Sequence, residues 1–321
     1  MGPKIKFASI ITTYRCNCKC HMSNVWQYPT KPSEEITPAD IARLPDIPFI
    51  NITGGEPFLR EDIDEILDVL KPKCKRVVIS SNGYWTERIL EVAEKHPWIG
   101  LRVSIEGLPK ANDELRGLTD GFDHGIRTLA ELNHRGFKDI GFGITLSDRN
   151  VGDLMELYHL AKMMGIEFAT AATHNSFYFH KHDNTFTKRK KIVTELEKLI
   201  KELLQSKKTK DWFRAYFNHG LANYVSGGER LLDCRMGSHA FFLDPFGNIR
   251  PCNGALDRIM GNIKQQTFSE IWNSAESEKI RDEVKNCPYQ CWMMGSVGER
   301  MKEDIKIPMK WVVKHKFLKK E

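Results

Sequence analysis

The sequence predicts an α/β fold in which a partial (β/α)6 barrel, open and TIM-like, is followed by a small C-terminal α+β domain. First, short β-branched or aromatic runs alternate with longer helical patterns from Phe7 to about Ala172, which is typical of parallel βαβ units. Second, six such units are too few to close an eight-stranded barrel. Third, the alternation stops near Trp212, and a cysteine-bearing region extends to about Trp292.

The expected strands and helices follow one another in a regular order. Six strands are expected at residues 7 to 12, 49 to 53, 76 to 80, 100 to 105, 139 to 146 and 166 to 172. Apolar residues at helical spacing predict helices between them at 38 to 44, 61 to 70, 86 to 95, 123 to 135 and 152 to 164. A charged helix at 186 to 206 is either the sixth barrel helix or a connector. We therefore divide the chain into a barrel (1–185), a helical connector (186–230), a cysteine-bearing domain (231–300) and a basic tail (301–321).

Length and composition limit the class of protein. A chain of 321 residues with 41% hydrophobic content can build one large domain and an appendage. It has no signal-like start and no apolar run of roughly 18 residues, so we expect a cytoplasmic protein without stable membrane insertion. The last 21 residues hold seven Lys against three acidic residues, which accounts for +4 of the net charge of +6. We interpret this tail as a solvated terminal segment rather than a membrane or nucleic-acid contact.

Eight cysteines form two groups and one outlier, Cys74. The first group comes directly after the first strand, and the second lies in the C-terminal region: Cys16, Cys18, Cys20; Cys234, Cys252, Cys287, Cys291. In a chain without a leader, such clustering favours soft-metal ligation over disulfides, and small buried thiols are the alternative. Metal centres of this kind predict a reducing or anaerobic setting.

Unusual residues follow the strands at the edge where parallel barrels place their reactive groups. Gly54 and Gly55 let the backbone approach a ligand, and Glu56 offers a carboxylate to an ammonium group. Ser104 and Glu106 can hydrogen-bond ribose hydroxyls. An ordinary βα turn and a capped strand end are the structural alternatives for these two segments.

The loop YRCNCKCHMSNVW, Tyr14 to Trp26, resembles the cluster loop of the radical S-adenosylmethionine (SAM) enzymes when it is read as C-x3-C-x2-C. In that reading the three positions are Cys16, Cys20 and Ser23. The resemblance implies a [4Fe-4S] cluster at these positions, with one open iron that the methionine part of SAM chelates. It also implies SAM contacts from the strand-end segments and an adenine contact from the residue before Ser23: Gly54, Gly55, Glu56, Pro57, Ser80, Asn82, Ser104, Glu106 and Met22.

Ser23 departs from the family pattern at the centre of the chemistry. A serine hydroxyl is a harder ligand than a thiolate, so we expect the cluster to be weak or absent and this form to be impaired. Cys18 lies two residues from each neighbouring cysteine, and we predict that it points away from them. Three explanations stay open, namely a deliberate Cys to Ser substitution, a natural non-catalytic relative, or an unusual cluster. The otherwise intact SAM apparatus favours the first.

The second cysteine group predicts a further metal site. The segment LDPFGNIRPCNG is typical of a β-hairpin with a Gly-Asn turn, and Gly247-x4-Cys252 lies within it. Together with Cys234, Cys287 and Cys291 it offers four thiols, enough for a [4Fe-4S] cluster, with a zinc site as the alternative. The pattern resembles the SPASM and twitch extensions of radical SAM proteins, and the one-cluster twitch form is the better match. Four protein ligands leave no open iron, so this cluster is expected to carry electrons.

These resemblances imply hydrogen abstraction by a 5′-deoxyadenosyl radical and net oxidation of a sugar, cyclitol or other small alcohol, with a flavodoxin or ferredoxin as electron donor. His174, Tyr178 and Arg116 are candidates for binding the substrate or removing its proton, and each also has a structural interpretation. Modification of a ribosomally made peptide is the first alternative. The early first strand disfavours it, because it leaves no room for a preceding peptide-binding domain. A non-catalytic, metal-bound binding protein is the second alternative.

Overall fold

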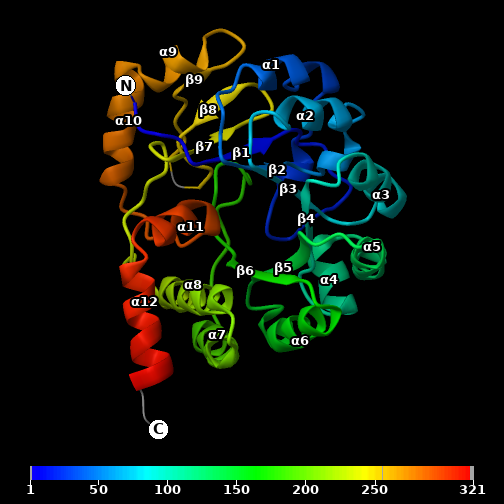
Figure 1. Ribbon diagram of the computed structural model, residues 1–321, viewed down its shortest axis with the longest axis vertical. Helices are drawn as coiled ribbons and strands as arrows, with labels where there is room; N and C mark the ends of the chain where they lie inside the picture. Colours follow the sequence, from blue (N-terminus) through cyan, green and yellow to red (C-terminus); the bar gives the residue numbers. More distant parts are fainter. Residues whose placement is uncertain (1, 255, 319–321) are drawn as a thin grey trace.

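A nine-stranded sheet organises the computed structural model, which describes residues 2–254 and 256–318 (Figure 1). The strand order is β6-β5-β4-β3-β2-β1-β7-β8-β9, and all neighbours from β6 to β7 are parallel. The barrel strands lie within one residue of the expected bounds: β1 Phe7–Ile11, β2 Phe49–Thr53, β3 Arg76–Ser81, β4 Gly100–Ser104, β5 Ile140–Leu146 and β6 Glu167–Ala172. The predicted partial (β/α)6 barrel is confirmed.

The helices between the barrel strands are also those that the apolar spacing predicts: α1 Pro38–Ala42, α2 Ile63–Leu70, α3 Thr86–Lys95, α5 Gly121–His134 and α6 Leu154–Met164. One helix in this region, α4 Pro109–Arg116, was not predicted, because its buried residues are only Asn112 and Leu115 and it has no apolar stripe. It forms through its ends. Pro109 occupies the first turn, and Gly117 ends the helix in the left-handed region with φ +55°.

The two faces of the barrel sheet differ in polarity. Ile10, Ile52 and Ile79 are fully buried in the main apolar core. Successive side chains of a strand point to opposite faces, so Ser9, Asn51 and Ser80 occupy the other face. The Ser80 hydroxyl donates to Asn51 Oδ1 at 3.1 Å. The inner face of the barrel therefore carries small polar side chains.

The C-terminal region continues the barrel sheet. Strand β7 Ala240–Leu243 pairs in parallel with β1, aligning Phe7 with Ala240, and β8 Asn248–Arg250 and β9 Gly261–Asn262 follow in antiparallel register (Figure 1). The predicted hairpin is confirmed, and Gly247 supplies the positive φ of its turn, +90°. The pairing of β7 with β1 was not predicted.

Helices complete the C-terminal half: α7 Arg189–Gln205, α8 Thr209–Ser226, α9 Phe268–Trp272, α10 Ala275–Lys285, α11 Met294–Glu303, α12 Lys306–Val312 and a final π-helical segment, η5 Val313–Leu318. The prediction of a solvated tail is wrong as far as Leu318, because α12 packs on α8 (Figure 1). Val312 is buried, and Trp311 stacks on His219 with ring centres 4.8 Å apart. The last three residues of the predicted tail lie outside the described chain.

Four short 3-10 helices lie in the loops: η1 Val25–Gln27, η2 Pro32–Glu34, η3 Pro57–Leu59 and η4 Val151–Asp153. Two of them, η1 and η3, flank the cysteine loop and the glycine turn respectively. Within residues 2–254 and 256–318, no helix combines the length and apolar character needed to cross a bilayer.

Candidate active site

The cysteine loop lies directly on the glycine turn that follows β2. Gly55 N donates to Thr13 O at 2.7 Å, and Glu56 N donates to Arg15 O at 2.8 Å. A Cβ atom would lie 2.5 Å from Thr13 O at Gly54 and 2.2 Å from Arg15 O at Gly55. No side chain fits at these separations, so the two glycines are needed for the approach of the loop.

The end of α4 holds the same loop from another side. Lys19 N donates to Arg116 O at 2.9 Å, and His21 N donates to Leu115 O at 2.8 Å. These bonds satisfy carbonyls that a helix C-terminus leaves without partners. Gly117 again has no room for a side chain, because a Cβ atom there would lie 2.6 Å from Lys19 O. The loop is thus fixed at both ends of its cysteine run.

The three loop cysteines lie together. Cys18 is buried, at 1% exposure, its backbone N–H donates to Cys16 Sγ at 3.4 Å, and its thiol lies near enough to those of Cys16 and Cys20 to interact with both. The contact with Cys18 lowers the pKa of Cys16, and contacts within the trio raise the pKa of Cys18 to about 11 and that of Cys20 above its usual range. The prediction that Cys18 points away is wrong. The loop is neither helix nor strand and bends at Asn17, so a spacing of two residues does not separate the side chains.

Arg116 places a positive charge beside these thiols. Its Nη2 lies 3.8 Å from Cys18 Sγ, and its Nη1 lies 3.6 Å from Glu106 Oε1. Burial acts to lower the pKa of Arg116, but Cys20, Cys18 and Glu106 raise it above its usual range. A permanent guanidinium charge suits a site that holds several thiolates.

Ser23 has a different local role. Its hydroxyl oxygen accepts a hydrogen bond from Val25 N at 3.3 Å, at the start of η1, and its carbonyl accepts one from Trp26 Nε1 at 3.1 Å. Serine often caps a turn in this way.

Glu56 joins two strand ends. Its carboxylate is fully buried and accepts hydrogen bonds from Asn82 N at 2.7 Å, Ser81 Oγ at 2.9 Å and Phe58 N at 3.2 Å. Burial raises the pKa of Glu56, and these donors oppose the rise. A carboxylate has about four acceptor directions, so little capacity is left for the expected ammonium contact. Pro57, the next residue, is buried as the first residue of η3.

Ser81 is a residue of this site that the sequence did not predict, since the expected contact residue at this strand end is Ser80. Ser80 faces the barrel interior, whereas Ser81 reaches Glu56. The signal that could have separated them is the period of two along β3. Asn82, which was selected, links the site together, because its Nδ2 donates to Asn17 Oδ1 in the cysteine loop at 2.7 Å.

The end of β4 supports Arg116. Glu106 is buried and accepts from Thr145 N at 2.6 Å in addition to its ion pair with Arg116. Burial raises the pKa of Glu106, and Arg116 opposes the rise. Ser104 ends β4 half-buried. Glu106 therefore lies against Arg116, and the ribose contact expected of it remains a prediction.

Residues 173–187, which follow β6, form a strap across the cysteine loop. Asn24 N donates to Phe179 O at 2.8 Å, and Asn184 Nδ2 donates to Met22 O at 3.2 Å. On its other side, the Ser176 hydroxyl donates to Asn253 O, next to Cys252. The strap therefore contacts the surroundings of both cysteine groups.

Two of the three proposed catalytic residues belong to the strap. The Tyr178 hydroxyl donates to Gly54 O at 2.9 Å, and burial raises its pKa. The ring nitrogens of His174 are buried without a hydrogen bond of normal geometry to the described residues. Burial lowers the pKa of His174, against a backbone contact with Ala172. Arg116 lies instead at the end of α4, and the catalytic roles of the three residues remain a prediction.

The four C-terminal thiols also come together. The charges of Cys252, Cys287 and Cys234 all act on Cys291, and that of Arg230 opposes them. Burial is the main cause that raises the pKa of Cys291, to about 11. Across the described residues, no three His, Cys, Asp or Glu side chains surround a single ion position. An iron–sulfur cluster has a different requirement, because each thiolate binds a separate iron.

A second apolar cluster contacts the second cysteine group and residues of the cysteine loop: Phe7, Ile11, Val25, Tyr178, Met236, Ala240, Phe242 and Val284. Cys234 and Cys252 pack against it at one end, and Tyr14 of the cysteine loop packs against it as well. The charge of Cys16 acts on Tyr178, which places this tyrosine beside the first group. The region that joins the two groups is therefore lined by apolar side chains.

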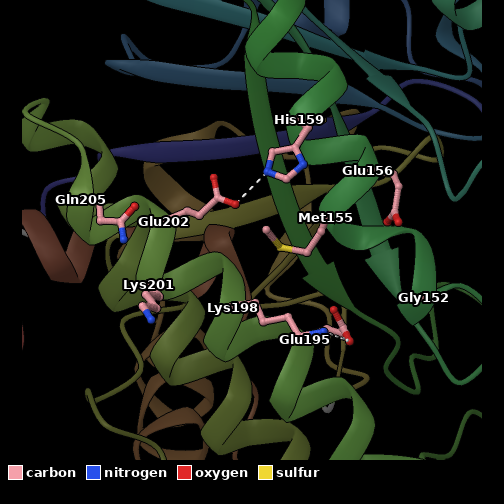
Figure 2. A pocket seen from close by; sticks show the side chains of 9 residues that line it. All are labelled: Gly152, Met155, Glu156, His159, Glu195, Lys198, Lys201, Glu202 and Gln205. Atoms are coloured by element: carbon pink, nitrogen blue, oxygen red, sulfur yellow. Dashed lines mark hydrogen bonds and ion pairs between the residues drawn. The ribbon is translucent and has the colours of Figure 1, made fainter.

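A surface pocket of about 540 Å³ lies elsewhere, between α6 and α7 (Figure 2). Its lining is mostly charged, and His159 Nε2 lies 2.7 Å from Glu202 Oε1 within it. None of the cysteines or the glycine turn lines this pocket, so we do not connect it with the site.

The donor sets fit iron–sulfur clusters. Thiolates are the ligands that such clusters use, and both groups offer several thiols within one neighbourhood. Comparison with known families agrees. The Radical SAM superfamily matches residues 10–161, and the SPASM iron-sulfur cluster-binding domain matches residues 234–292.

Curated relatives come from several pathways. Fe-coproporphyrin III synthase of Methanosarcina barkeri is 33% identical over 157 residues, which cover 46% of this chain but only 39% of the relative. AdoMet-dependent heme synthase of the same organism is 28% identical over 300 residues, 84% of this chain and 83% of the relative. Mycofactocin maturase MftC of Mycobacterium tuberculosis is 25% identical over 264 residues, 78% of this chain and 63% of the relative.

The cofactors follow from these two domains. The Radical SAM domain implies SAM and a [4Fe-4S] cluster, and the SPASM domain implies auxiliary iron–sulfur clusters. Both matched segments contain the cysteine groups that the structure brings together. The chain therefore contains a radical SAM domain in its barrel and a SPASM iron–sulfur domain in its C-terminal region.

Proposed function

We propose that this chain is a radical SAM oxidoreductase that removes a hydrogen atom from a substrate at the barrel mouth and transfers the surplus electron to one auxiliary cluster. The observation that supports this proposal best is the second apolar cluster, which contacts the cysteine loop through Tyr14 and Val25 and the second cysteine group through Cys234 and Cys252. It extends from Tyr178, beside Cys16, to Cys234 and Cys252. An apolar connection suits electron transfer between two centres in one chain.

Bound at the two sites, SAM and the clusters supply a 5′-deoxyadenosyl radical and an electron acceptor. The chain's own residues hold and shield this chemistry. Gly54 and Gly55 admit the cysteine loop, and Arg116 balances its thiolate charge. The hydroxyl of Tyr178 fastens the strap to the glycine turn.

For the substrate we propose a tetrapyrrole precursor that carries carboxylates. Two relatives bear names of heme-pathway synthases, and neither of those names nor that of MftC describes a sugar or cyclitol enzyme. The loop edge is also basic, because Lys19, His21 and Arg149 are exposed there. Arg149 Nη1 lies 3.1 Å from His21 Nε2. Exposed guanidinium and ammonium groups bind carboxylates well.

A precursor peptide is the second candidate substrate, and the name of MftC, a maturase, is what favours it. For either substrate we propose a flavodoxin or ferredoxin as reductant and a cytoplasmic location, because the clusters need a reducing compartment.

The test is anaerobic reconstitution of the chain and of its Ser23→Cys variant, followed by iron counting and assay of 5′-deoxyadenosine. Each form is incubated with an iron-containing porphyrin that carries propionates, with a small diol and with a precursor peptide. We expect SAM cleavage by the cysteine form and turnover of the porphyrin alone.

Absence of both iron uptake and SAM cleavage in the Ser23→Cys form would refute the enzymatic proposal. Turnover of the peptide or the diol instead of the porphyrin would leave the radical chemistry standing and overturn the substrate assignment.

A further inference from the structure

We propose that Cys18 supplies the third thiolate of the barrel cluster, so that the loop binds iron through Cys16, Cys18 and Cys20 instead of Cys16, Cys20 and Ser23. This inference rests on the proposed SAM cluster site. It turns a C-x3-C-x2-C site that lacks one cysteine into a complete C-x-C-x-C site.

The position of the Cys18 side chain is the first argument. The side chain is 1% exposed, does not belong to the main apolar core, and lies near enough to the thiols of Cys16 and Cys20 to interact with both. Its own backbone N–H donates to Cys16 Sγ at 3.4 Å. Three thiols are thus already on one side of the loop, which is the arrangement that three irons of one cluster require.

The charge next to Cys18 is the second argument. Arg116 Nη2 lies 3.8 Å from Cys18 Sγ, and the guanidinium is held there by Glu106. A buried cation is costly unless an anion lies near it. Glu106 supplies one negative charge, and a thiolate at Cys18 supplies a second.

The fixed backbone is the third argument. The Lys19 N–H, between Cys18 and Cys20, is bonded to Arg116 O at 2.9 Å, and the next bond follows at His21. These contacts keep the residues around Cys18 in place. The Ser23 hydroxyl, by contrast, already accepts the Val25 N–H and is a hard ligand.

The experiment compares four full-length forms after anaerobic reconstitution with iron and sulfide: the chain as given, Cys18→Ala, Ser23→Ala, and the double variant Cys18→Ala/Ser23→Cys. Iron per chain is counted, and the reduced clusters are examined by electron paramagnetic resonance with and without SAM. Circular dichroism of the forms without iron checks the fold. Ser23→Ala is the matched control, because it removes the competing oxygen from the same loop.

We expect Cys18→Ala to lose about four irons per chain and the signal that SAM perturbs, because one whole [4Fe-4S] cluster is lost. Ser23→Ala should keep both. The double variant should regain both, which shows that the loss in Cys18→Ala does not come from misfolding.

Retention of all iron by Cys18→Ala, or loss of the SAM-sensitive signal in Ser23→Ala, would overturn the proposal. The chain as given could also bind only the auxiliary cluster, while the double variant gains the second cluster. That result would overturn the assignment of Cys18 and leave the proposed function intact. If the double variant binds no second cluster either, both proposals fail.

Discussion

The cysteine loop can pack against the glycine turn only because the glycines there have no Cβ atom. At Gly55 the missing Cβ is what allows Arg15 O to approach, and Glu56 N completes the contact. The demand is steric and does not depend on charge, so it holds with or without iron.

We predict that Gly55→Ala lowers the free energy of unfolding by about 1–3 kcal/mol, because its Cβ would lie 2.2 Å from a backbone carbonyl that cannot swing away. The variant should also bind less iron at the first site. Gly152→Ala is the matched control, since its only near neighbour is the flexible end of Lys191 at 3.9 Å. Denaturant unfolding of the iron-free forms measures the free energy of unfolding of both variants. Equal stability of the two variants would contradict the prediction.

The hydroxyl of Tyr178 connects the strap to the glycine turn. It donates to Gly54 O, so we expect Tyr178→Phe to lose about 0.5–1.5 kcal/mol of stability. A positioning role predicts normal SAM cleavage with a raised KM, because only the fastening of the strap changes. A role in proton removal predicts an unchanged KM and a lower kcat whose pH profile shifts. Steady-state kinetics of the variant between pH 6 and about 9 distinguishes these roles.

Ion pairs at the amino ends of the barrel strands connect neighbouring strands. Asp139, just before β5, accepts from Arg76 Nε at 2.7 Å and from Arg102 Nη2 at 2.6 Å, which joins β3, β4 and β5. Burial acts to raise the pKa of Asp139, but the two arginines lower it to about 2 from 3.8. The stabilisation is therefore present above pH 3.8 and is lost as the pH falls toward about 2.

We predict that Asp139→Asn costs on the order of 1 kcal/mol at neutral pH, since about a third of the carboxylate side chain is exposed and solvent screens the pair. The stability difference from the parent should shrink as the pH falls from 3.8 to about 2. Asp46→Asn, at an exposed position without an ion pair among the described residues, is the control. Unfolding curves at several pH values test this. A difference that is independent of pH would exclude the ionic explanation.

On the scale of the whole molecule, the β1–β7 pairing makes barrel and C-terminal domain one continuous sheet. The auxiliary thiols are therefore attached to the same framework as the cysteine loop, with the strap and the second apolar cluster in contact with both surroundings. This arrangement suits a reaction that starts at the cysteine loop and ends at the auxiliary thiols.

We predict that Cys252→Ala removes about four irons per chain yet leaves SAM cleavage in place, because the first site keeps its own ligands. Oxidised product should fall at least tenfold for want of an electron acceptor. Cys74→Ala, outside both groups, is the control and should change neither quantity. Iron content, 5′-deoxyadenosine and product are measured in the same reaction. Loss of SAM cleavage in Cys252→Ala would show that the two sites are not independent.

The sequence by itself determined the barrel strands, most barrel helices, the hairpin and the membership of the two cysteine groups. Each rests on local spacing, where the period of apolar residues or of cysteines is already visible in the chain. Only the tertiary structure decided the pairing of β7 with β1, the choice of Ser81 over Ser80 at Glu56, and the inward direction of Cys18. Arg116 and Cys18 are 98 residues apart in sequence, and no local pattern records such a contact. Their meeting depends on how α4 ends against the loop, which is a property of the folded chain.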